Sequence, residues 1–119
     1  MPGIIAHDSN KIARFLLVDS SGRLYVNLNP ATTVYSGQKD VANAGTRTTL
    51  RATLAILSIT IRAKKTNTGN IFVGNIAVDS TNGFILSPNE TVTLDIDDVA
   101  DVYIDSAVDG EGVSWIAVA

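Results

Sequence analysis

The fold of this chain is decided by residues 57–64, which read Leu57-Ser58-Ile59-Thr60-Ile61-Arg62-Ala63-Lys64. Apolar and polar side chains alternate here with a period of two, so that the two kinds point to opposite faces of an extended chain. The alternation returns at residues 91–97, where apolar side chains are separated by threonines and aspartates. Both stretches predict half-buried β-strands, with Leu57, Ile59, Ile61 and Ala63 pointing inward in the first and Val92, Leu94 and Ile96 in the second.

Segments rich in Gly, Asn, Asp and Pro separate the apolar stretches, at residues 66–70, 79–83, 87–89 and 109–112. Turn signals at roughly eight- to twelve-residue intervals are typical of a β-sandwich or barrel. No helical stripe of apolar residues persists for three turns, so we expect no long helix. We therefore predict an all-β chain whose residues 46–119 form a single antiparallel β-sandwich of about eight strands.

Residues 1–45 differ from this pattern. Two extended pieces, residues 13–18 and 23–29, flank the turn residues 19–22, so a β-hairpin is expected. Residues 31–45 show little periodicity and contain Gly37 and Gly45, as surface loops and arms often do. We expect residues 1–45 to form an N-terminal extension that ends in an extended arm.

Composition excludes several kinds of chemistry. The chain has no cysteine and a single histidine, His7, so a thiolate zinc site, a cysteine nucleophile, a catalytic triad and a multi-histidine metal site are excluded. No phosphate-binding glycine loop is present. The longest apolar run, residues 15–18, is far shorter than the roughly 20 residues that span a bilayer. We expect neither an enzyme nor a cofactor, and no membrane partner.

Charge is divided unevenly along the chain. All nine basic residues precede Thr66, where three acidic residues oppose them, so residues 1–65 carry +6 while residues 66–119 carry −9. Two interpretations remain open: the two halves fold onto each other, or a basic segment docks on an acidic face of another molecule. We expect no nucleic-acid partner, because the basic residues are dispersed without interleaved aromatics and the acidic half repels phosphate.

Two groups of side chains are candidates for a site. The first is an acidic cluster, in which alternate residues Asp95 and Asp97 share one strand face and bring their carboxylates near enough for a divalent cation. No calcium-binding loop motif accompanies them, so we favour a solvated or docking face and predict no metal site. The second group is Phe72, Tyr103 and Trp115, for which we favour core packing over a sugar-stacking platform because their strands are so apolar.

Residues 46–119 resemble a known family, and the first 45 residues do so only loosely. The stretches that carry the resemblance are Asn70-Ile71-Phe72-Val73-Gly74-Asn75, Ser80-Thr81-Asn82-Gly83-Phe84, Leu86-Ser87-Pro88-Asn89-Glu90, Val102-Tyr103-Ile104-Asp105-Ser106 and Val113-Ser114-Trp115-Ile116. In this order they are similar to small β-sandwich domains of tailed-bacteriophage virion proteins. Asn89 stands where that family often has Gly, and either residue tolerates a left-handed backbone. The resemblance implies a jelly-roll-like sandwich of a head decoration (cement), head-fibre or tail protein.

These observations together give a functional expectation. The chain is expected to be made in the host cytoplasm and to lie on the outer capsid surface, where it binds the major capsid protein and reinforces the shell. It is expected to associate with itself as a homotrimer by pairing strand edges. The expected partner-binding residues are Arg14, Arg23, Arg47 and Arg51, and the acidic docking face is Asp95, Asp97, Asp98 and Asp101. The alternative is a host-glycan-binding or adaptor module of a tail or head fibre.

Overall fold

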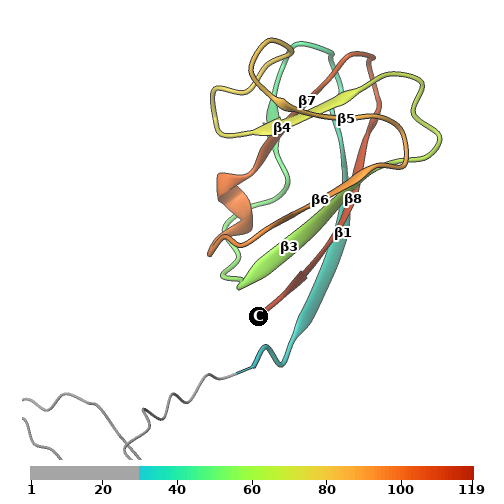
Figure 1. Ribbon diagram of the computed structural model, residues 1–119. Helices are drawn as coiled ribbons and strands as arrows, with labels where there is room; N and C mark the ends of the chain where they lie inside the picture. Colours follow the sequence, from blue (N-terminus) through green and yellow to red (C-terminus); the bar gives the residue numbers. More distant parts are fainter. Residues whose placement is uncertain (1–29) are drawn as a thin grey trace, which may run out of the picture. The chain divides into compact units, whose positions relative to one another are not determined.

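Eight β-strands form two antiparallel four-stranded sheets in the computed structural model, which describes residues 30–119 (Figure 1). The prediction of an all-β antiparallel sandwich is confirmed. The expected hairpin of residues 13–18 and 23–29 lies outside the described residues, as do His7, Arg14 and Arg23. Within the described part, no helix combines the length and the apolar character needed to cross a membrane.

The strand orders of the two sheets interleave distant parts of the sequence. The first sheet has the order β1-β8-β3-β6, from β1 (Val34–Asp40), β8 (Gly112–Val118), β3 (Ser58–Ala63) and β6 (Thr91–Leu94). The second has the order β2-β7-β4-β5, from β2 (Thr48–Thr49), β7 (Tyr103–Ser106), β4 (Ile71–Gly74) and β5 (Phe84–Leu86). First and last strands pair, and so do third with sixth and fourth with fifth, so the chain folds over itself as a nested set of pairs.

The core lies between the sheets and follows the predicted alternation. Ile59, Ile61 and Ala63 of β3 are fully buried, and Val113 and Ala117 of β8 face the same side. The second sheet contributes Ile71, Val73, Leu86 and Ile104 to the same cluster. Leu57 was predicted to point inward, but it precedes the first residue of β3 and its side chain is 55% exposed. The inward pattern therefore holds for the residues of β3 and for Val92, Leu94 and Ile96, which pack against the core.

The predicted boundary between residues 45 and 46 is wrong. Residues 34–40 form β1, which pairs along its whole length with β8 in the register Val34↔Val118 to Asp40↔Gly112. This strand was missed because its inward positions are Tyr35, Gly37 and Lys39, which carry no aliphatic side chain. The sandwich therefore begins before Val34, and Thr33 already exchanges backbone hydrogen bonds with Ala119.

A short 3₁₀ helix, η1 (Val99–Asp101), joins β6 to β7 (Figure 1). Its N-cap is Asp98, whose carboxylate accepts a hydrogen bond from the Ala100 N–H. The turn between β5 and β6 contains Asn89 with a φ of 72°, a left-handed conformation that asparagine tolerates.

Candidate interaction surface

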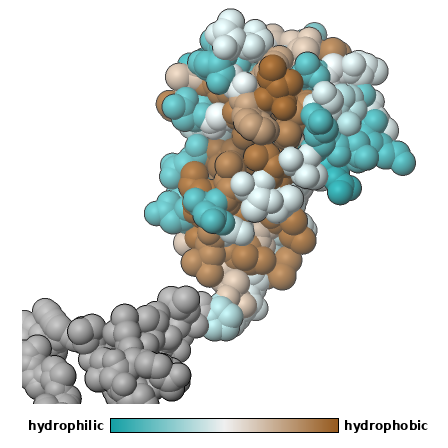
Figure 2. All heavy atoms as spheres, in the orientation of Figure 1, coloured by the Kyte–Doolittle hydropathy of each residue, from teal (hydrophilic) through white to brown (hydrophobic). Residues whose placement is uncertain are grey.

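The outer face of the first sheet is built from short polar side chains around exposed aliphatic ones. Since Ile59, Ile61 and Ala63 point into the core, the residues between them point outward, and the strand registers place those of the neighbouring strands beside them. One cross-strand row is Ser36–Ile116–Thr60–Thr93, and the next is Gln38–Ser114–Arg62–Thr91. The side chains of Val34 and Ile116 are 65% and 50% exposed. Figure 2, in whose orientation strands of both sheets are in view, shows hydrophobic residues along the middle of the visible side and hydrophilic residues at its margins.

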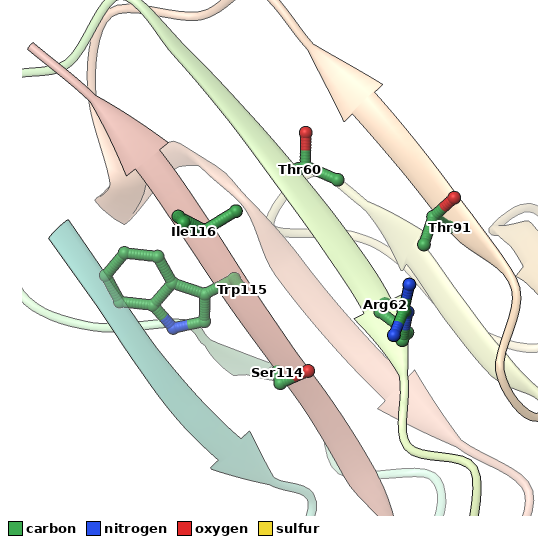
Figure 3. A pocket seen from close by; sticks show the side chains of 6 residues that line it. All are labelled: Thr60, Arg62, Thr91, Ser114, Trp115 and Ile116. Atoms are coloured by element: carbon green, nitrogen blue, oxygen red, sulfur yellow. The ribbon is translucent and has the colours of Figure 1, made fainter. Parts of the chain in front are cut away.

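A shallow depression of about 280 Å³ lies on this sheet, lined by Thr60, Arg62, Thr91, Ser114, Trp115 and Ile116. Figure 3 shows the side chains of Thr60 and Arg62 on β3 and of Ser114 and Ile116 on β8, while the Trp115 ring extends over β1. Thr60 Oγ1 lies 2.9 Å from Thr93 Oγ1. The lining offers hydroxyl groups, one guanidinium and an aliphatic side chain. The hydroxyl and guanidinium groups can form hydrogen bonds, and the Ile116 side chain offers apolar contact area.

The free edge of β1 borders this face. Thr33 and Ala119 exchange hydrogen bonds of 2.7 and 2.9 Å, and the Val41 N–H donates to Glu111 O at 2.9 Å. Because backbone groups alternate in direction along a strand, residues 35, 37 and 39 also point their N–H and C=O groups toward β8. The groups of Val34, Ser36, Gln38 and Asp40 therefore point away from the sheet, and no hydrogen bond from another described residue reaches them.

The basic candidates within the described residues flank β2. Arg47 precedes β2, Arg51 follows it, and both side chains are exposed. Arg51 Nε donates to Ala52 O at 3.2 Å, which holds the guanidinium close to its own loop. Arg47 lies near enough to Asp79 to help lower the pKa of that carboxyl, although hydrogen bonds from Thr81 lower it most. Arg47 and Arg51 are thus accessible to a partner.

The acidic candidates lie on the segment from the end of β6 to η1. Asp95, Asp97 and Asp101 are exposed, whereas Asp98 is half-buried. The Asp98 carboxylate accepts from the Leu54 N–H at 3.0 Å and from the Ala100 N–H at 2.9 Å. These bonds hold the pKa of Asp98 below its ordinary value, the bond from Leu54 being the larger cause. Asp98 is therefore a capping residue that ties two loops together, and the other three form the accessible part of the acidic face.

The structure places one basic candidate, Arg51, on a loop beside the acidic candidates. The Leu50 N–H donates to Val102 O at 3.2 Å and the Ile56 N–H donates to Asp97 O at 3.0 Å, so residues 50–56 lie beside residues 97–102. The loop that carries Arg51 and the acidic segment are therefore neighbours at one part of the surface. The ion pair found between described residues joins Lys64 Nζ to Asp40 Oδ1 at 2.7 Å instead, and both belong to the basic half of the chain.

The strand order also bears on the uneven charge. In the first sheet, β1 and β3 come from the basic half, and they alternate with β8 and β6 from the acidic half. The described residues thus interleave the two halves within one sandwich. For residues 30–119, which the structure describes, this arrangement favours the interpretation that the basic and acidic halves fold onto each other.

Two further carboxylates stabilise loops. Glu111 accepts from the Thr68 and Gly69 N–H groups at 2.6 and 2.9 Å, and the Gly69 bond is the main reason why its pKa is lowered. Asp105 is buried on β7 and accepts from the Gly45 and Ser106 N–H groups at 2.9 and 2.8 Å. Each carboxylate satisfies backbone donors that a turn leaves without partners, which is a structural use of acidic residues.

The aromatic candidates do not form an exposed platform. Trp115 is 6% exposed and belongs to the core cluster. Phe72 is also buried, on the outer side of β4, where a Cβ built on Gly83 would meet its Cβ and a methyl group of Val78. The prediction that Trp115 and Phe72 serve packing is confirmed, while Tyr103 is half-buried.

Sequence reasoning missed the residues that make the interaction surface, above all Val34, Ser36 and Ile116. The signal that identifies them is cross-strand register, which a single sequence does not display.

Within the described residues, no group of three or more His, Cys, Asp or Glu side chains is arranged to hold a metal ion. Comparison of the chain with protein-family models, curated proteins and solved structures finds no match in any of the three.

Proposed function

We propose that this chain is a structural protein of a bacteriophage particle that decorates the outer surface of the head and reinforces the shell. It binds the major capsid protein and further copies of itself, and it catalyses no reaction. The proposal joins the family resemblance of residues 46–119 to the surface of the first sheet. The outer face of the first sheet is the structural observation that supports the proposed capsid role most directly.

The outer face of the first sheet suits adhesion for a physical reason. Its side chains are mostly Ser and Thr, which lose little conformational entropy when a partner immobilises them. Val34 and Ile116 supply exposed apolar area between them, and an apolar patch rimmed by polar residues is typical of an interaction site. Burial of this area against a neighbouring protein is the expected source of affinity.

The fold proposed for this role is a jelly roll. The nested strand pairs β1–β8, β3–β6 and β4–β5, together with β2–β7, support this assignment. Eight strands divided between two sheets in this way are the arrangement found in many capsid domains. Strand order alone does not identify a function, because one fold supports many.

Basic residues are proposed to direct the protein onto the capsid. Arg47 and Arg51 are exposed, and Arg14 and Arg23 complete the set at sequence positions outside the described residues. An exposed arginine steers association with an acidic surface and loses this effect as salt is raised. The nearby Asp95, Asp97 and Asp101 would face a basic segment of a neighbouring copy.

The decisive experiment counts copies of this chain in purified particles by quantitative mass spectrometry. The proposal expects many copies, in a fixed ratio to the major capsid protein, and weaker particles when the gene is deleted. Absence from particles, or a few copies confined to the tail, would overturn it.

In a second experiment, particles lacking the protein are mixed with the Arg47→Glu/Arg51→Glu variant or with Lys65→Glu as the control. We expect the double variant to bind at least tenfold more weakly and the control to bind as the wild type does.

A further inference from the structure

We propose that β1 of one molecule pairs with β1 of a second copy, in an antiparallel register centred on Gly37. The inference deepens the self-association in the proposed function and rests on that part alone. It concerns the free backbone edge of residues 34–40, which neither the family resemblance nor the charge pattern indicated.

Among the described residues, nothing pairs with this edge, and it is seven residues long. Four residues, Val34, Ser36, Gln38 and Asp40, direct their N–H and C=O groups away from β8. Sheet edges are usually protected by proline, by a bulge or by brevity, yet this strand has seven residues, no proline and continuous pairing with β8. One protective feature is present, because Lys39 is charged and lies on the inward face. A partner strand must therefore accommodate Lys39.

A second copy of β1 does so. When Gly37 faces Gly37 of the second copy, Lys39 faces Tyr35, Ser36 faces Gln38 and Val34 faces Asp40, each in both directions. All seven residues of each strand are then paired, as a two-fold interface requires. The lysine stem and ammonium group lie beside a tyrosine ring, which favours a cation.

The same register keeps like charges apart. The two Lys39 residues are four positions apart along the ladder, or about 13 Å, which exceeds the Debye length of about 8 Å at physiological salt. Asp40 is already neutralised by Lys64 at 2.7 Å in its own molecule. A register centred on Lys39 would place two ammonium groups directly opposite each other, which destabilises a sheet. Charge thus selects against that alternative.

Pairing of this kind joins the two first sheets into one sheet of eight strands. Their outer faces lie on the same side, because hydrogen-bonded neighbours in an antiparallel pair point their side chains the same way. Val34 and Ile116 of both copies then contribute to one extended surface. A two-fold pairing predicts a dimer, so it competes directly with the homotrimer expected from the sequence.

The test uses the full-length protein and measures its mass by analytical ultracentrifugation over a range of concentrations. We expect a species of twice 12.6 kDa. Ser36→Pro removes an N–H that points away from β8, so it blocks the edge and leaves the β1–β8 bonds in place, as prolines do on natural edge strands. We expect this variant to dimerise at least tenfold more weakly. Ser36→Ala, which keeps the N–H, is the matched control.

A cross-link tests the register itself. The chain has no cysteine, so Val34→Cys/Asp40→Cys introduces the only thiols. In the proposed register these residues are a hydrogen-bonded pair across the dimer, with Cα atoms about 5.5 Å apart, which fits a disulfide. Within one molecule they are about 20 Å apart and cannot join. We expect the double variant to form a covalent dimer on oxidation, and each single variant to remain uncross-linked.

The other possible outcomes of these experiments separate three statements: the pairing of β1, its register, and the capsid role. A monomer at all concentrations, a trimer, or a dimer that persists in Ser36→Pro would overturn β1 pairing. A dimer that proline disrupts but the cysteine pair does not cross-link would overturn the register. A dimeric protein that is absent from virions would refute the capsid role alone, whereas a monomer abundant in virions would refute only the pairing.

Discussion

Gly37 of β1 lies against the indole ring of Trp115 of β8, its partner across the sheet. A Cβ built on Gly37 would be 2.8 Å from Cζ2 of the indole and 3.1 Å from Nε1. The ring extends over the edge strand and occupies the inward space that a larger residue at position 37 would otherwise fill (Figure 3). The Trp115 indole thus fills the core space beside Gly37 at the edge of the first sheet.

This contact predicts that Gly37→Ala destabilises the protein. The added methyl group meets a rigid, buried ring, and overpacking of this kind costs about 1–3 kcal/mol. Urea unfolding followed by Trp115 fluorescence measures the loss directly, since this is the only tryptophan. Ser36→Ala, one residue away and exposed, is the control and should change the free energy of unfolding by less than about 0.5 kcal/mol. Equal stability of Gly37→Ala and the wild type would show that the indole moves without cost.

A second prediction concerns the indole N–H. Nε1 of Trp115 is buried without a hydrogen-bond partner among the described residues. Trp115→Ala leaves a large cavity and should cost about 3–5 kcal/mol. Trp115→Phe keeps much of the ring and removes the unpaired donor, so its cost should be clearly smaller. Both variants are compared by circular dichroism during urea unfolding. A Phe variant as unstable as the Ala variant would show that the N–H has a partner that stabilises it.

The same pair of residues explains how far the sequence predicts the structure. β3 and β6 were predicted because the residues that fill the space between the sheets, such as Ile59 and Val92, belong to the strands themselves. β1 was not, because Trp115 from a neighbouring strand fills the space above Gly37. Alternation is a signal only where a strand supplies its own core residues.

The candidate site was predictable to a lesser degree, for a related reason. Charged residues are visible in a sequence, and Arg47, Arg51 and Asp97 are indeed exposed. Asp98 is also a charged residue that is visible in the sequence, yet its carboxylate caps η1 and accepts a hydrogen bond from the Leu54 N–H. Only the distant residue that faces a carboxylate decides whether it is available to a partner, and no local pattern identifies that residue.

The cap gives a prediction about acid stability. The pKa of Asp98 is lowered in the folded state, chiefly by the N–H of Leu54 and then by that of Ala100. A lowered folded-state pKa contributes stability that is present above the ordinary value of 3.8 and is lost as pH falls through the folded value. Asp98→Asn should therefore flatten the fall in unfolding free energy below about pH 4.5, while keeping an oxygen that accepts the same bonds.

The control for this measurement is Asp97→Asn, one residue earlier. The Asp97 side chain is exposed, and it does not cap η1. Urea unfolding at a series of pH values from about 3 to 7 should give a wild-type profile for Asp97→Asn and a flatter one for Asp98→Asn. Identical profiles for the two variants would show that the cap does not bind the charged form more strongly.

A last prediction concerns the turn between β5 and β6, where Asn89 has a φ of 72°. Its N–H donates to Ala63 O at 2.9 Å, so the turn fixes the start of the β3–β6 ladder and cannot easily relax to another conformation. Asn89→Gly removes the Cβ that makes this φ unfavourable and should be neutral within about 0.5 kcal/mol or slightly stabilising. Asn89→Ala retains a Cβ and loses the tolerance of Asn for this region, so it should cost about 1 kcal/mol. Thermal and urea unfolding of the two variants are compared side by side, and the order Gly above Ala is the expected result. An Ala variant as stable as the Gly variant would mean that the turn adopts a different φ.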